Sequence, residues 1–166
     1  MDPKTNPFPK SDADRHALWT MLVERDIAAF VAADWSMVDG DFRKEGFFGL
    51  NAQGSELPDS WRLGFPSIEV YRDEWLRQAQ ESAKTEFAED LATGIFRATN
   101  MRDIDVSGDT AVCHKKFDGT IKKADGSVDI LSWQTLYFCA KIKGEWKIAG
   151  FVGYMPYPMG RSRAKL

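Results

Sequence analysis

The stretch from residue 110 to residue 155, TAVCHKKFDGTIKKADGSVDILSWQTLYFCAKIKGEWKIAGFVGYM, decides the fold. Apolar and polar side chains alternate along it, which is the period of a β-strand. Asp125-Gly126 and Lys143-Gly144 interrupt the alternation, and Asp-Gly between two such runs is a strong hairpin signal. Together with the residues just before it, this stretch predicts an antiparallel meander whose strands span about 95–106, 110–122, 128–142 and 145–155.

Upstream of the strands, the apolar residues repeat with helical spacing. They predict a long helix over about 12–33 and another over about 68–88, for which Ser67 is a suitable N-cap. Between them we expect a short helix within 36–50 and a loop over 51–66. Helices followed by an antiparallel sheet indicate an α+β fold, with the helices packed on one face of a curved sheet.

The chain has 166 residues, which is the length of one domain. We expect a single domain over 11–157, preceded by a flexible, proline-containing arm over 1–10 and followed by a short basic tail over 158–166. The arm lacks the apolar core of a secretory signal, and no apolar run approaches the roughly 20 residues of a membrane span. The expected location is therefore the cytoplasm, with no membrane partner.

Charge and residue types exclude further classes of partner. The formal net charge of −3 has the wrong sign for a sequence-independent nucleic-acid binder. Two cysteines and two histidines without close spacing predict neither a disulfide framework nor a metal site, and we expect no cofactor. Aromatic residues make up 13% of the chain, so we expect an aromatic-rich core or pocket and a small apolar or polycyclic molecule as the partner.

The turns also predict which side chains share a face of the sheet. With two-residue turns, Asp103 opposes His114, and His114 opposes Tyr137. The resulting polar and aromatic face, our candidate for a pocket, carries Asp103, His114, Trp133, Thr135, Tyr137, Ile148, Val152 and Tyr154. The other face, with Phe138 and Phe151, is more uniformly apolar and predicts a homodimer through the outer face of the sheet. A slip of one residue would exchange the faces of a strand.

Two short motifs flank these elements: Asp34-Trp35 after the first helix, and Gly-x-Trp-Lys-Ile at 144–148 in the last hairpin. In this order the chain resembles the NTF2-like superfamily over about residues 12–156, and its SnoaL-like and scytalone-dehydratase-like branches are the most similar. The resemblance implies a cone-shaped, cystatin-like roll. In it the curved antiparallel sheet wraps around the long N-terminal helix and leaves a hydrophobic pocket, and dimers are common.

Asp26 and His114 are the predicted catalytic residues. By resemblance, Asp26 stands where ketosteroid isomerases carry an oxyanion-binding tyrosine, and the other catalytic residues of these isomerases and of scytalone dehydratase are not kept. Asp26 lies in the apolar stripe of the first helix between Leu22 and Phe30, where desolvation suits a general acid or base. At the stripe's edge it would instead pair with an arginine or with water. His114 could move a proton with Asp26 or Asp103, or be an ordinary strand histidine.

The candidate substrate-binding residues are aromatic and polar side chains expected around the same pocket. They are Asp34, Trp35, Trp61, Tyr71, Trp75, Asp103, Trp133, Thr135, Tyr137 and Tyr154. For Asp34 and Trp35 the alternative is a helix cap and a core residue, and for the tyrosines it is packing. Trp61 lies in a glycine-containing loop that could cover the pocket or pack in the core.

Two functions of different classes follow from these features. The first is a small-molecule pocket protein that acts as a cofactor-independent lyase, isomerase or cyclase, such as a dehydratase, by acid–base catalysis on an apolar oxygenated substrate. The second is a non-catalytic domain that binds a hydrophobic ligand or serves as a dimerising accessory domain. The geometry of Asp26 and His114 separates the two, because the enzyme requires both side chains to reach one cavity.

Overall fold

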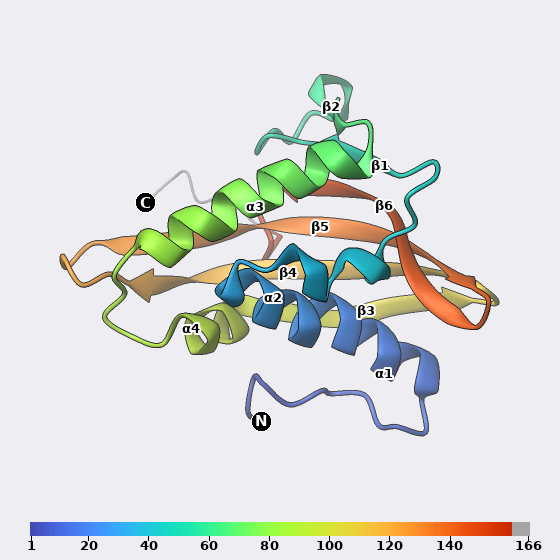
Figure 1. The fold of residues 1–166 in the computed structure, drawn as a ribbon, viewed down its shortest axis with the longest axis horizontal. Helices are drawn as coiled ribbons and strands as arrows, with labels where there is room; N and C mark the ends of the chain where they lie inside the picture. The colour runs from blue at the N-terminus through green and yellow to red at the C-terminus, as the bar shows by residue number, and fades with distance from the viewer. Residues whose placement is uncertain (161–166) are drawn as a thin grey trace.

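A computed structural model describes residues 1–160 and contains a six-stranded sheet in the order β2-β1-β6-β5-β4-β3, with helices against one face (Figure 1). The predicted α+β fold with a curved sheet and a long N-terminal helix is confirmed. The strands of the meander are β3 (Thr99–Ser107), β4 (Thr110–Lys122), β5 (Val128–Ile142) and β6 (Glu145–Met155).

Two short strands extend the sheet beyond the predicted meander. β1 (Phe48–Asn51) runs parallel to β6, and β2 (Arg62–Phe65) pairs antiparallel with β1. The sequence predicts a short helix and a loop here, because strands of this length carry too few residues for a periodic signal. Gly49 lets β1 lie close to its neighbours, since a Cβ there would be 2.8 Å from the Phe151 ring.

The first predicted helix is a continuous rod of three segments that crosses the sheet (Figure 1). The segments are α1 (Ala13–Trp19), the π-helical η1 (Thr20–Arg25) and α2 (Asp26–Ala32). The rod ends at Ala33, whose φ of 50° is left-handed and stops the helix. The observed limits agree with the predicted helix over 12–33, whereas its π-helical middle has no signal in the periodicity.

α3 (Ile68–Lys84) begins after the predicted N-cap, where the Ser67 hydroxyl accepts a hydrogen bond from the Val70 amide. α4 (Leu91–Ala98) lies where the sequence predicts the start of a strand. Asp90 caps it by accepting a hydrogen bond of 3.0 Å from the Thr93 amide. The helix therefore has its own start signal, and it packs on β4 at one end of the sheet.

The loop between β4 and β5 is longer than the predicted two-residue turn. The last pair before it joins Lys122 to Val128. Every pairing of the two strands is therefore displaced by one residue, and His114 opposes Leu136 rather than Tyr137. Because a one-residue slip moves side chains to the other face, the predicted placement of His114 beside Tyr137 is wrong.

A bulge also shifts the register of β5 with β6. The shift lies next to Phe138, so that Tyr137 opposes Phe151. Phe151 is 2% exposed and lies inside the molecule, which contradicts its predicted place on the partner-facing side. Phe138 does lie on the outer face, where its ring centroid is 6.1 Å from that of Phe48.

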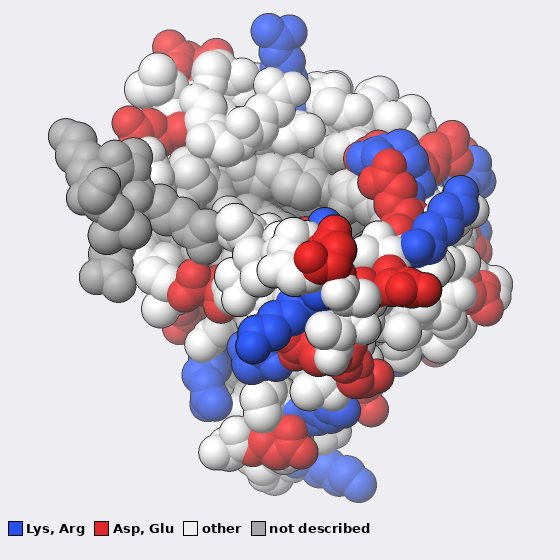
Figure 2. Space-filling model, turned by 90° about the vertical axis from the view of Figure 1, so that its left-hand side faces the viewer, with Lys and Arg blue, Asp and Glu red and all other residues white. Residues whose placement is uncertain are grey.

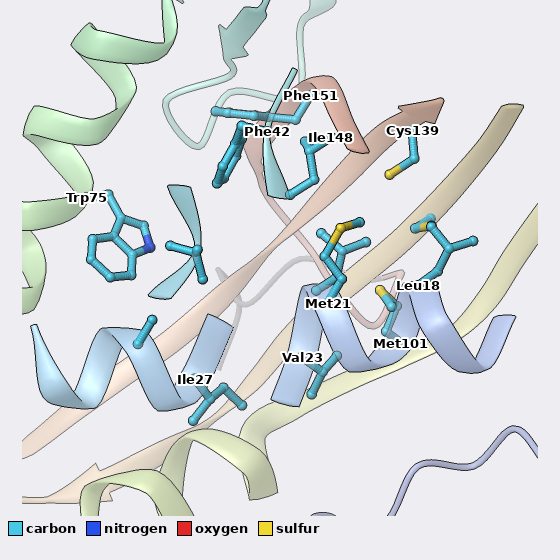
Figure 3. Packing of buried hydrophobic residues seen from close by; sticks show 14 of the residues in the cluster. Leu18, Met21, Val23, Ile27, Phe42, Trp75, Met101, Cys139, Ile148 and Phe151 are labelled. Carbon is cyan, nitrogen blue, oxygen red and sulfur yellow. The ribbon is translucent and has the colours of Figure 1, made fainter. Parts of the chain in front are cut away.

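The main core lies between the helical rod and the sheet (Figure 3). Leu18, Met21 and Ile27 contribute from the rod, and Cys139 and Ile148 contribute from the sheet. A cluster of aromatic side chains continues the core towards α3. This packing orients the rod relative to the strands and so determines which of its side chains face the sheet.

Residues within the arm predicted over 1–10 contact the rod. The Asn6 side-chain amide donates to the His16 carbonyl over 3.0 Å, and His16 Nδ1 lies 2.8 Å from the Phe8 carbonyl. Of the expected tail over 158–166, the last six positions lie outside the described residues. No described helix combines the length and apolar character needed to cross a membrane.

Candidate functional site

A cavity of about 370 Å³ lies between α2, α3, α4 and the concave side of the sheet. It opens near the end of α3 and the β4–β5 loop. Figure 2 shows this end of the molecule hollowed, with acidic and basic side chains intermingled beside the hollow. The lining includes Asp26, Phe30, Tyr71, Trp75, Gln78, Lys115, Phe117, Trp133, Thr135, Tyr137, Phe151 and Tyr154.

An ion pair joins the first helix to the sheet at this cavity. Lys115 Nζ on β4 lies 3.1 Å from Asp26 Oδ2 on α2. The lysine side chain is 1% exposed and the aspartate side chain 32% exposed. The indole N–H of Trp75 donates to the other carboxylate oxygen over 3.3 Å. Both oxygens of Asp26 therefore have a protein donor, while part of the carboxylate remains accessible.

The π-helical segment η1 supplies the second partner of the lysine. The Asp26 amide donates to the Val23 carbonyl rather than to Leu22, four residues back, where an α-helical bond would end. The Leu22 carbonyl instead accepts a hydrogen bond of 2.5 Å from Lys115 Nζ. Such π-helical turns occur frequently at functional sites. Here the Leu22 carbonyl, within η1, accepts from the buried ammonium group of Lys115.

Two tyrosines on opposite sides of the cavity are held in the neutral form. Burial raises the pKa of Tyr71 and of Tyr137 well above the ordinary value, and the negative charge of Asp26 contributes to both increases in pKa. A neutral phenol keeps its O–H donor at neutral pH. Tyr71 and Tyr137 can therefore donate a hydrogen bond to an oxygen atom of a molecule in the cavity.

A row of aromatic rings forms the wall on the sheet side. The Phe117 and Trp133 centroids are 4.6 Å apart, and the Trp133 and Tyr154 centroids are 6.1 Å apart. At the end of this row, Gln78 Nε2 donates to the Tyr154 hydroxyl over 3.1 Å. Flat apolar groups stack favourably on such a surface.

Three solved structures share this architecture at low sequence identity. An NTF2-like protein of unknown function from Pseudomonas putida KT2440 has a TM-score of 0.58 at 13% identity, covering 93% of this chain and 95% of that one. An NTF2-like superfamily protein from Salmonella enterica has a TM-score of 0.55 at 15% identity, covering 95% of this chain and 100% of that one. A domain of unknown function with a cystatin-like fold from Nostoc punctiforme has a TM-score of 0.55 at 12% identity, covering 90% of this chain and 80% of that one.

The fold is NTF2-like. The likeness concerns the fold alone, since these neighbours are less than one fifth identical to the chain. No protein-family model matches the sequence, and no curated protein matches it significantly. Proteins that share a fold can have unrelated functions. The chemistry of this protein therefore depends on the residues of its own cavity.

The structure brings most of the predicted aromatic residues to the cavity of this NTF2-like fold. Seven of the predicted site residues line it, namely Asp26, Tyr71, Trp75, Trp133, Thr135, Tyr137 and Tyr154. Thr135 is 4% exposed. Their roles in substrate binding or catalysis stay predictions.

His114 and Asp103 lie on the other side of the sheet. They oppose each other, as predicted, but His114 Nε2 lies 2.6 Å from Gln134 Oε1 and Asp103 is exposed. Neither lines the cavity. The structure therefore does not bring His114 together with Asp26, and the predicted acid–base pair is contradicted. The cause is the longer β4–β5 loop, which reverses the expected faces of β4.

The remaining predicted residues have structural roles outside the cavity. Asp34 accepts hydrogen bonds from the amide and hydroxyl of Ser36 and caps a short 3-10 helix, η2 (Trp35–Met37). Trp35 is a core residue, 8% exposed. Trp61 donates its indole N–H to the Ser55 carbonyl over 3.0 Å, which anchors its loop. Asp34, Trp35 and Trp61 therefore make the contacts of the structural alternatives, and none of them lines the cavity.

Lys115 and Gln78 are among the site residues that the sequence analysis missed. Lys115 occupies a strand position between Cys113 and Phe117, whose side chains are buried on the inner face. The sequence did contain a signal for Lys115, because a lysine stands at a strand position where the alternation predicts an apolar side chain. Within residues 1–160, no group of three or more His, Cys, Asp and Glu side chains is arranged to hold a metal ion.

Proposed function

We propose that the protein binds a small, mostly apolar organic molecule that carries a carbonyl or hydroxyl oxygen, and that Asp26 transfers a proton on this molecule. The observation that carries the proposal is a partly accessible carboxylate lining an aromatic cavity, held in place by the ion pair with Lys115. The cavity volume of about 370 Å³ suits a molecule of this kind.

Each group has a part in the proposed chemistry. Asp26 takes a proton from the carbon next to a substrate carbonyl, and the phenol of Tyr71 or Tyr137 donates a hydrogen bond to the oxygen on which negative charge develops. Returning the proton to another carbon completes an isomerisation. Donating it instead to a departing β-hydroxyl group, which leaves as water, completes a dehydration. Lys115 and Trp75 hold the carboxylate in one orientation throughout.

Proton exchange on an enolisable ketone tests the proposal directly. With 2-tetralone in D2O, we expect the protein to speed the replacement of the C1 protons by deuterium, measured by NMR. Asp26→Asn should remove this acceleration, since a positioned base contributes about 10²- to 10⁴-fold. The matched control is Asp103→Asn, because Asp103 is exposed and does not line the cavity. Equal exchange by the wild type and Asp26→Asn would contradict the catalytic role.

The second candidate function is ligand binding without catalysis. It is supported by the fact that Trp75 and Lys115 already donate to both oxygens of Asp26. In that case the carboxylate only anchors a hydroxyl group of the ligand. The expected result is then tight binding of a phenol such as 2-naphthol, weakened in Asp26→Asn, with no deuterium exchange on 2-tetralone.

A further inference from the structure

An open groove lies on the other side of Tyr154 from the cavity. Three side chains, those of Gln78, Trp133 and Tyr154, line both the cavity and the groove. They come from α3, β5 and β6 respectively. At this place, side chains rather than backbone therefore separate the cavity from the groove.

A hydrogen bond joins two of the three side chains that form this boundary. Gln78 Nε2 donates to the Tyr154 hydroxyl over 3.1 Å, across 76 positions of sequence. Both partners are neutral, so the bond is weaker than an ion pair or a charge-assisted hydrogen bond. Rotation of the Tyr154 ring therefore requires the loss of this hydrogen bond and of the contact with the Trp133 ring.

A bulge in β6 directs Tyr154 to this position. Gln134 pairs with Met155, whereas the register of the preceding pairs would place it opposite Tyr154. Tyr154 has a φ of 59°, a left-handed conformation that is uncommon for a bulky residue. Its carbonyl accepts a hydrogen bond of 2.8 Å from the Gly54 amide. β-Bulges commonly re-aim a side chain beside an active site, and this one turns the tyrosine to the boundary.

The groove beyond the boundary has an apolar base and a charged rim. Phe65 and Met155 are 6% and 8% exposed, and Val70 is an exposed apolar side chain at 43%. Asp73 and Arg77 from α3 stand at the edge. An apolar chain fits this base, whereas a charged group would be held at the rim.

From this arrangement we infer that Tyr154 and Gln78 form a removable partition, and that the site takes elongated ligands. The polar end of such a ligand lies at Asp26, and its apolar chain displaces the Tyr154 ring and continues into the groove. The substrate class is an oxygenated head with an extended apolar tail. The inference rests on the proposed binding function, from which it takes the position of the head.

A homologous series of 4-alkylphenols, from 4-methylphenol to 4-heptylphenol, tests the partition. Binding is measured by calorimetry on the wild type, Tyr154→Phe and Gln78→Leu. Each variant removes the hydrogen bond between Gln78 and Tyr154 from one side, and Gln78→Leu also removes the one that Gln78 Nε2 donates to Glu74 over 3.1 Å. We expect the longer phenols to bind about 2- to 10-fold more tightly to both variants than to the wild type, because the tail no longer has to break the bond between Gln78 and Tyr154. The affinity of 4-methylphenol, which lacks a tail to displace the Tyr154 ring, should change much less than that of the longer phenols.

The controls separate this inference from the proposed function. Gln80→Leu makes the same substitution at an exposed position of α3 and should leave every affinity unchanged. Asp26→Asn should weaken the whole series. If the short phenols bind through Asp26 while the variants change no affinity, or change all affinities equally, the partition is refuted and the binding function stands. If no phenol binds the wild type, both proposals are contradicted.

Discussion

Lys115 places a positive charge on a strand face that otherwise carries apolar side chains such as Cys113 and Phe117. Burying an ammonium group is costly unless charged and hydrogen-bonding partners surround it. Asp26 and the Leu22 carbonyl meet this need, and the Phe117 ring lies 5.0 Å from the nitrogen. The charge thus links the helical rod to the sheet beside the cavity.

Replacing this charge should lower stability. We expect Lys115→Met to reduce the free energy of unfolding by about 1–3 kcal/mol, because the buried Leu22 carbonyl loses its donor and Asp26 loses its counter-charge. Urea unfolding measures the difference. Lys116→Met, one position along β4 on the outer face, is the matched control and should have little effect. Equal stability of Lys115→Met and the wild type would show that the ion pair contributes nothing to folding.

The two buried phenols predict a loss of stability in alkali. Their pKa values are raised in the folded protein, so the folded state favours the neutral phenol. This contribution is complete below the pKa of an unfolded tyrosine, about 10, and is lost as the pH rises above it. We expect Tyr71 and Tyr137 to ionise only when the protein unfolds, measured by phenolate absorbance together with circular dichroism. Ionisation of all four tyrosines near pH 10 in a folded protein would contradict this.

At the scale of single residues, the sequence located part of the site. The position of Asp26 within the apolar stripe of a helix indicated an interior side chain, with an ion pair at the edge of the stripe as the alternative. The structure combines the two, since Asp26 lines the cavity and pairs with Lys115. His114 was a candidate because histidine side chains in general titrate near neutral pH. Residue type, however, does not determine on which face of a strand a side chain lies. Lys115 was overlooked because lysine is rarely buried.

Among the elements, α4 lies against β4 without room for a side chain at Gly94. A Cβ at this position would lie 2.9 Å from Ile121 Cγ1. Alanine normally stabilises a helix interior relative to glycine by about 1 kcal/mol. Here the contact with Ile121 opposes that preference, because both residues are buried and neither can move freely.

We therefore expect Gly94→Ala to destabilise the protein despite its better helix propensity, by about 1–3 kcal/mol as for an overpacked core. Thermal and urea unfolding measure the change. Introducing Gly94→Ala into an Ile121→Ala background removes the contact, so that there the substitution should become neutral or stabilising. If Gly94→Ala is stabilising in the wild-type background, helix propensity is stronger than the packing constraint.

The elements themselves were predictable where their periodic signal was long. The rod, α3 and the meander each carry enough residues for the apolar pattern to show, and Ser67 marks the start of α3. β1 and β2 are too short for such a signal, and they exist because β6 offers an edge to pair with. The β4–β5 register depended on one turn, whose length the Asp-Gly pair did not determine.

For the whole molecule, the outer face of the sheet suggests a second subunit. Phe48 and Phe138 lie together there, and Val112 on β4 is 38% exposed. We predict a homodimer through this face, measured by sedimentation equilibrium, and expect Val112→Glu to weaken it by placing a charge in the interface. Val128→Glu, at a position next to the β4–β5 loop that is 44% exposed, is the control. A wild type that sediments as a monomer at high concentration would contradict the prediction.

By itself, the sequence determined the order of the rod, α3 and the four-stranded meander, the α+β class and the presence of many aromatic side chains around an acidic residue on the first helix. These features follow from the spacing of apolar and polar residues along the chain, which the sequence itself contains. Only the tertiary structure decided that Lys115 rather than His114 meets Asp26, and that Tyr154 borders two spaces. The first depends on the length of the β4–β5 loop and the second on a bulge in β6, and a displacement of one residue in a strand exchanges the faces on which side chains meet.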